Sequence, residues 1–192
     1  MMIERLVRSI VALFLVCSVS LSLVRADHCD ESRFTTGPVD RELAGVKLFA
    51  LLPDAIAELG QPSRHRDFTG ADYPEGSGEA EYIWEIEGTQ VTLYTMYRRD
   101  ESSARVETTV SVEISGQPAK SDRKRKLLTT SRGLSLGAKR VDVEKRYGPL
   151  FLHEVLKGRG SLSYCWEDDT WLTFYFEKSR LVSTIHLLGS VE

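Results

Sequence analysis

Cysteine and histidine are two residue types in this chain that could supply a nucleophile and a general base. Alternation of apolar residues predicts strands near residues 161–167 and 181–188, and it places Cys165 and His186 on the same face of the sheet. A thiol beside an imidazole can act as a nucleophile, because the imidazole accepts the thiol proton. No third side chain that would orient His186 is evident, and oxidation of Cys165 would abolish this chemistry. A hydrolytic enzyme that uses Cys165 and His186 is therefore the third of three hypotheses.

The histidines do not have the spacing of a metal site. His28, His65, His153 and His186 are far apart in the sequence, whereas zinc-binding histidines usually come in closely spaced sets. The acidic triplet at residues 167–169 could bind Ca²⁺ weakly through its carboxylates, although a polar turn explains it as well. We therefore predict no metal site, no cofactor and no enzymatic activity.

The first 26 residues have the pattern of a secretory signal peptide. A short basic segment precedes an apolar stretch at residues 10–24, and small or apolar residues suit a cleavage before Asp27. An uncleaved membrane anchor is the alternative, but these fifteen residues are fewer than the ~20 that a spanning helix needs. The sequence predicts an exported protein, periplasmic or extracellular, with no stable membrane span after cleavage.

Cleavage before Asp27 would make the chain more acidic. The full sequence has 25 Lys and Arg against 28 Asp and Glu; the leader removes three arginines and one glutamate, which leaves 22 basic and 27 acidic residues and a net charge of −5. Nucleic-acid binding depends on a concentrated basic surface. The composition therefore argues against nucleic acid as a partner.

Cleavage also leaves two cysteines, Cys29 and Cys165. In an oxidising compartment such a pair is first interpreted as a disulfide. This bond would tie an N-terminal arm to the C-terminal half of the chain, and closing so long a loop stabilises a fold by roughly 4–5 kcal/mol in chain-entropy estimates. Two free thiols, or a disulfide to another molecule, are the alternatives.

The elements that would position these side chains occur twice along the chain. Residues 82–85 (Tyr-Ile-Trp-Glu) and 164–167 (Tyr-Cys-Trp-Glu) each precede a strand-like apolar segment, and each follows a short helix pattern that ends in glycine, at Gly60 and Gly148. The matches persist inside the expected elements and slip only in loops, where insertions are tolerated. The chain is therefore predicted to be an internal duplication.

Each copy is expected to fold as a helix followed by antiparallel strands. Pro53 and Gly60 delimit the first helix, and alternating apolar residues predict three strands in each copy, near 80–87, 90–98 and 105–115 and near 161–167, 171–177 and 181–188. The predicted fold class is α+β, with two tandem helix-plus-three-stranded antiparallel modules whose helices lie on one face. Whether the two sheets merge into one concave surface stays open. The predicted organisation is a signal peptide (1–26), an N-terminal arm (27–42), a first module (43–116), a charged linker (117–128) and a second module (129–192).

The duplicated residues carry a resemblance to known families. Residues 133–137 (Gly-Leu-Ser-Leu-Gly), the helix that ends at residues 147–149 (Tyr-Gly-Pro) and the Tyr-Cys-Trp-Glu segment resemble the helix-plus-sheet module of the BamE (SmpA/OmlA) outer-membrane proteins. Two such modules in tandem resemble the β-lactamase inhibitory protein-like fold. The resemblance covers residues 43–188 and implies protein binding on a concave sheet. BamE proteins are lipid-anchored single modules, whereas this chain has two modules and no lipobox, and Phe49 stands where the second copy has Gly137.

One sheet face is left uncovered if the helices lie on the other. We call the face away from the helices the open face. Tyrosine on such a face often marks an interaction surface, because the ring buries area while its hydroxyl keeps a hydrogen bond; a solvated antiparallel face is the alternative. The predicted contact residues, by alternation along the strands, are Tyr94, Glu107, Tyr175, Thr184 and His186.

The first functional hypothesis is an exported, non-enzymatic module that binds another protein through its open face. The second is a structural or assembly factor of the cell envelope that associates peripherally with membrane complexes. The hydrolase that uses Cys165 and His186 is the third, and a disulfide at Cys165 would exclude it.

Overall fold

The computed structural model describes residues 35, 38–69, 73–100, 102–148, 152–156, 159–166, 168–177 and 181–190. The predicted signal peptide and the Cys29 end of the predicted disulfide lie outside the described residues. Within these ranges, no helix is long and apolar enough to cross a membrane.

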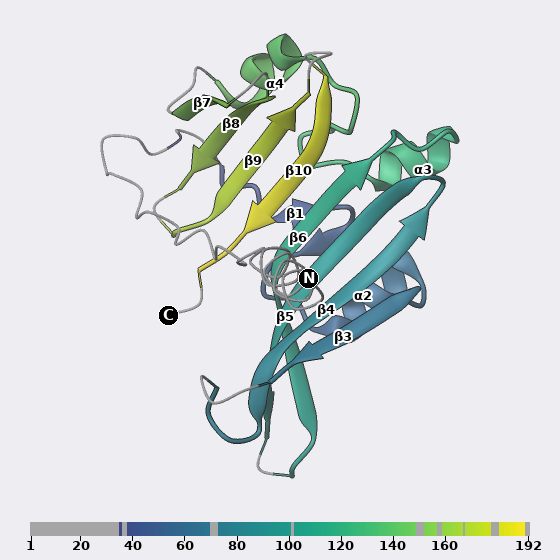
Figure 1. Ribbon diagram of the computed structural model, residues 1–192, viewed down its shortest axis with the longest axis vertical. Helices are drawn as coiled ribbons and strands as arrows, with labels where there is room; N and C mark the ends of the chain where they lie inside the picture. The colour runs from purple at the N-terminus through teal and green to yellow at the C-terminus, as the bar shows by residue number, and fades with distance from the viewer. Residues whose placement is uncertain are drawn as a thin grey trace, which may run out of the picture.

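An antiparallel sheet of eight strands dominates the fold. Its order is β3-β4-β5-β6-β10-β9-β8-β7, and Figure 1 shows β6 and β10 side by side where the two halves of the sheet meet. A separate two-stranded sheet pairs β1 with β2. The strands are β1 (Glu42–Leu43), β2 (Val46–Lys47), β3 (Arg64–Phe68), β4 (Ser77–Ile86), β5 (Thr89–Arg99), β6 (Arg105–Gly116), β7 (Leu152–Leu156), β8 (Arg159–Cys165), β9 (Trp171–Phe176) and β10 (Val182–Leu188).

The prediction of two helix-plus-three-stranded modules is wrong. The last strand of the first half, β6, pairs with the last strand of the second half, β10, from Ser115 opposite Thr184 to Ser111 opposite Leu188. Each half also has a fourth strand, β3 or β7, outside the three that were expected. Two separate sheets would leave the backbone groups of β6 and β10 unpaired at exposed edges, and pairing the two strands removes both edges.

The helices are short and lie behind the sheet. They are α2 (Leu52–Leu59), α3 (Asp122–Leu127) and α4 (Arg140–Tyr147), and Figure 1 shows α2 behind β3 and β4. Pro53 lies in the first turn of α2, where its missing N–H costs no helical hydrogen bond. Gly60 ends the same helix, and its N–H donates to the carbonyl of Ile56. The predicted start and end of the first helix are therefore confirmed.

The core lies between the sheet and the helices. β4 alternates between buried and partly exposed residues along most of its length, which is the pattern of a strand with one face on a core. Trp84 and Trp166, which occupy matching positions in the two halves, are 3% and 2% exposed and belong to this core. The largest fully buried side chains are Tyr164, Phe174, Leu43, Leu93, Ile114, Leu162, Leu172, Ile185 and Leu187.

The duplication is also visible in the backbone. Gly45 and Gly133 both have φ of 75°, and Gly60 and Gly148 have φ of 86° and 93°. Phe49 and its counterpart Gly137 have φ of 63° and 81°. A left-handed conformation costs a non-glycine residue about 1–3 kcal/mol, so the first half holds a phenylalanine at a position whose backbone favours glycine.

Candidate functional site: the open face of the sheet

Two irregularities in the strands decide which side chains reach the open face. The pairing of β5 with β6 shifts by one residue after Tyr94. Tyr94 stands opposite Ser111, and the next residue, Thr95, stands opposite Thr109. The pairing of β10 with β9 shifts between Val182 and Thr184. Because side chains alternate along a strand, an extra residue moves every side chain beyond it to the other face.

Glu107 lies on the helix side as a result, and its predicted place on the open face is wrong. Its side chain is 9% exposed and accepts hydrogen bonds from the hydroxyls of Tyr82 (2.8 and 2.9 Å) and Thr95 (2.9 Å). Nε of Arg105 lies 2.6 Å from Oε1 of Glu107. The carboxylate is thus fully engaged inside the protein.

Arg105 extends this buried network toward the edge of the sheet. Its two terminal nitrogens bond both carboxylate oxygens of Asp67 at 2.7 and 3.0 Å, and its guanidinium lies 3.7 Å from the centre of the Tyr97 ring. The hydrogen bond from Arg105 is the main cause that lowers the pKa of Asp67 to about 2. This cluster joins β3 to β6 and is best explained as a structural ion-pair network.

The other four predicted contact residues lie on the open face. Tyr94 on β5 stands opposite Ser111, and Ser111 Oγ lies 2.6 Å from Nε2 of His186 on β10. Thr184 stands opposite Tyr175 on β9, and Tyr175 is 42% exposed. The merged sheet therefore brings together residues from both halves of the chain, which could not share a surface if the halves were separate modules.

Two glutamates that the sequence analysis did not select complete the centre of this face. Glu81 on β4 stands opposite Tyr94 and accepts a hydrogen bond of 3.0 Å from its hydroxyl. Glu113 on β6 stands opposite Thr92 and His186. Alternation along residues 79–85 could have revealed Glu81, because it places Glu79, Glu81 and Glu85 on the face opposite Trp84.

Burial and negative charge shift the pKa values of this cluster. Burial, followed by the hydrogen bond to Glu81, raises the pKa of Tyr94 to about 12. Burial also raises the pKa of Glu113, and the charge of Glu81 adds to the effect. Burial lowers the pKa of His186 to about 4. Burial therefore favours the neutral form of His186 and works against the ionisation of Glu113 beside it.

Cys165 and His186 do not form the nucleophile pair considered above. Cys165 on β8 stands opposite Trp171, whereas His186 stands opposite Thr173. The two residues are separated by one intervening strand and by two positions along the sheet, a distance on the order of 10 Å from strand spacing alone. The imidazole instead contacts Ser111.

The N-terminal arm reaches the strand that carries Cys165. The N–H of Thr35 donates to the carbonyl of Cys165 at 2.7 Å, and the N–H of Cys165 donates to the Thr35 hydroxyl at 3.2 Å. This contact is consistent with a tie between the arm and β8. The bond from Cys165 to Cys29 itself stays a prediction.

The described residues contain no cluster of three or more His, Cys, Asp or Glu side chains that could hold a metal ion. In the acidic triplet at residues 167–169, Glu167 lies outside the described residues. Asp168 forms an ion pair of 2.5 Å with Arg41. Asp168 also accepts a hydrogen bond from the backbone N–H of Thr170. These contacts favour the interpretation of this segment as a polar turn.

Comparison with known proteins gives weak similarities. No protein-family model matches the chain, and no curated protein matches it. A DUF4309 family protein, YjgB from Bacillus subtilis, is 14% identical with a TM-score of 0.39, over 73% of this chain and 79% of that chain. An extracellular protein containing a SCP domain from Bacillus anthracis is 12% identical with a TM-score of 0.46, over 80% of this chain and 48% of that chain. The chain thus spans about half of the Bacillus anthracis protein, and similarities at this level carry no argument about function.

Proposed function

We propose that the protein is an exported, non-enzymatic module that binds another protein through the open face of its sheet. The observation that carries the proposal is the make-up of this face, where Tyr94 lies between Glu81 and Glu113, which form an acidic centre, and Tyr175 lies two strands beyond Glu113. Tyrosine supplies a large contact area and loses little side-chain entropy on binding. The leader pattern of the sequence supports export.

The charge of the face suggests the chemistry of the partner. The charge of Glu81 contributes to the raised pKa of Glu113, so the two glutamates are close enough to interact. A basic side chain of the partner would relieve this repulsion, since opposite charges across an interface favour association. The preferred partner is therefore a protein that presents lysine or arginine to Glu81 and Glu113, beside a surface that contacts Tyr94 and Tyr175.

Replacing Tyr94 and Tyr175 together by alanine is expected to weaken partner capture by at least ~100-fold, because central aromatic residues often contribute 2 kcal/mol or more each. The affinity of the immobilised double variant for the captured partner is measured beside that of the wild type. Val141→Ala on α4 is the matched control, since Val141 is 61% exposed and lies on the helix that packs behind the sheet. Equal capture by the wild type and a folded double variant would contradict the assignment of this face.

A further inference from the structure

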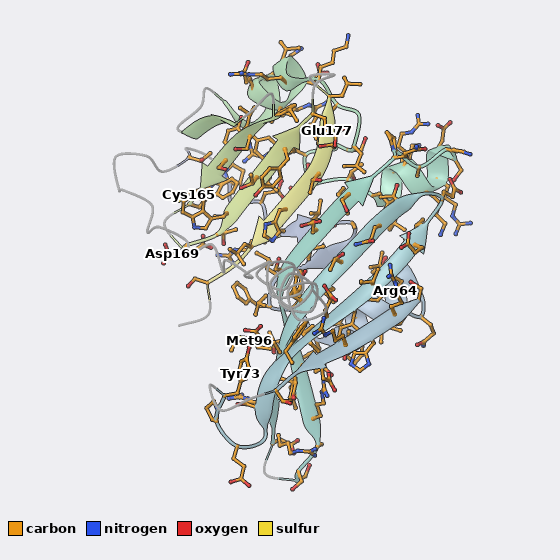
Figure 2. All side chains as sticks on the ribbon, in the orientation of Figure 1. Arg64, Tyr73, Met96, Cys165, Asp169 and Glu177 are labelled. Carbon is orange, nitrogen blue, oxygen red and sulfur yellow. The ribbon has the colours of Figure 1, made fainter. Side chains whose placement is uncertain are left out.

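A groove opens at the end of the open face where β5 and β6 extend past β10. Its volume is about 630 Å³, within the size range of ligand-binding clefts. The segment that leads into β4 forms one wall, and Figure 2 shows Tyr73 of this segment close to Met96 of β5. Phe49 contributes to the lining, together with Val106 and Val110 of β6.

Exposed apolar side chains gather at this groove. Phe49 and Met96 line it and are 41% and 40% exposed, and Leu51, 47% exposed, pairs with the groove residue Thr108. Single exposed apolar residues are ordinary on protein surfaces, but a concave cluster of them is typical of a binding site. Among the described residues, the remaining large exposed apolar side chains are Val141, Tyr175 and Leu181, which belong to other parts of the fold.

Phe49 has a conformational reason to be singled out. Its backbone is left-handed, and the corresponding position in the second half is Gly137. Its ring lies against the backbone of Gly189, where an added Cβ would come within 2.5 Å of the ring carbon Cζ. The ring therefore packs on Gly189 at the edge of the groove with part of its surface exposed, which suits an aromatic contact for a bound ligand.

The rim of the groove carries positive charge. Arg98 and Arg99 line it, against one acidic residue, Glu75. Arg99 donates to the carbonyl of Ser103 at 3.0 Å, whereas the side chain of Arg98 is exposed and has no hydrogen bond or ion pair with any other described residue. In a chain whose net charge is −3, this groove is a local basic site beside apolar walls.

We infer that the groove binds an apolar peptide segment that carries an acidic side chain, with Phe49 as the apolar contact and Arg98 as the charge contact. The inference rests on the proposed function, because the segment would belong to the protein that the open face binds. The acidic centre of the face and the basic rim of the groove would then orient the partner, since each attracts the opposite charge.

A labelled peptide tests this inference. The probe is a short fluorescent peptide of alternating leucine and aspartate, and the comparison peptide has lysine in place of aspartate. Fluorescence anisotropy is expected to show tighter binding of the aspartate peptide. Arg98→Glu is expected to weaken that binding at least ~10-fold and to reverse the preference toward the lysine peptide.

Phe49→Gly is the second variant, because glycine occupies the matching left-handed position in the other half of the chain. It is expected to keep the fold, checked by its urea midpoint, and to weaken binding of the aspartate peptide at least ~10-fold. Val141→Ala is expected to bind like the wild type. Equal affinity for the two peptides, or undiminished binding by a folded Phe49→Gly variant, would overturn the inference.

Partner capture by the same variants separates this inference from the proposed function. If the double tyrosine variant loses the partner while Phe49→Gly and Arg98→Glu keep it at full affinity, the open face is supported and the groove is rejected. If the groove variants lose both the peptide and the partner while the tyrosine variant keeps full affinity, the groove is supported and the tyrosine assignment is rejected.

Discussion

Replacing Glu107 by alanine is expected to lower the free energy of unfolding by about 3 kcal/mol. The change removes the acceptor of the Tyr82 and Thr95 hydroxyls and the carboxylate that pairs with Arg105. Breaking a buried ion pair by deleting one partner typically costs 3–5 kcal/mol, and the lower end applies because the Arg105 side chain is 29% exposed. Urea unfolding of the two proteins measures the difference.

Two variants control this result. Glu107→Gln keeps the shape of the side chain and one acceptor oxygen, so the free energy of unfolding is expected to fall by about half as much as in Glu107→Ala. Glu144→Ala removes the carboxylate of a partly exposed pair with Arg140, one turn apart on α4, and is expected to cost at most about 0.5 kcal/mol. If Glu107→Ala and Glu144→Ala had equal effects, the buried network around Glu107 would not be a main support of the fold.

Acidification is expected to destabilise the protein through His186. Its pKa is about 4 in the folded protein and 6.5 without the protein environment. Between these values the unfolded chain binds a proton that the folded protein excludes, so stability falls as the pH is lowered from 6.5 toward 4. The shift corresponds to a loss of about 2–3 kcal/mol at pH 4.

The comparison of wild type with His186→Gln isolates this effect. Glu113, opposite His186, has a pKa that burial raises, so the folded protein gains stability from it as the pH falls and partly masks the histidine. Subtracting the variant's unfolding free energy from that of the wild type at each pH removes most of this contribution. A difference that stays constant from pH 7 to 4 would show that His186 is not buried as a neutral imidazole.

The sequence predicted the elements of the sheet better than their arrangement. Alternation in residues 105–115 predicted β6, which spans Arg105–Gly116, and the glycine stops predicted the ends of α2 and α4. β3 was missed because its residues 64–68, Arg-His-Arg-Asp-Phe, show no apolar alternation. Such charge is typical of an edge strand, which needs hydrogen bonds on one side only and protection from further pairing.

The merger of the halves and the shift in the pairing of β5 with β6, which leaves Val110 of β6 as the extra residue, had no local signal in the sequence. β6 and β10 are distant in the sequence, and their pairing depends on two edges that meet only in the folded protein. The extra residue lies in a run of threonine, valine and serine at residues 108–111, any of which suits either face. Glu107 was therefore assigned to the open face, while Tyr94, on the far side of the irregularity, was placed correctly.

Site-specific photo-cross-linking tests the central claim most directly, namely that the open face is the surface that binds another protein. A benzophenone amino acid is placed at Tyr175 on the open face and, in a second protein, at Val141 on the helix side. Both positions are exposed, at 42% and 61%, so the benzophenone can reach a partner from either position. The proposed function predicts one discrete cross-linked protein from position 175, lost when Tyr94 is also replaced by alanine, and none from position 141. The absence of a cross-link at 175, or the same product from both positions, would contradict it.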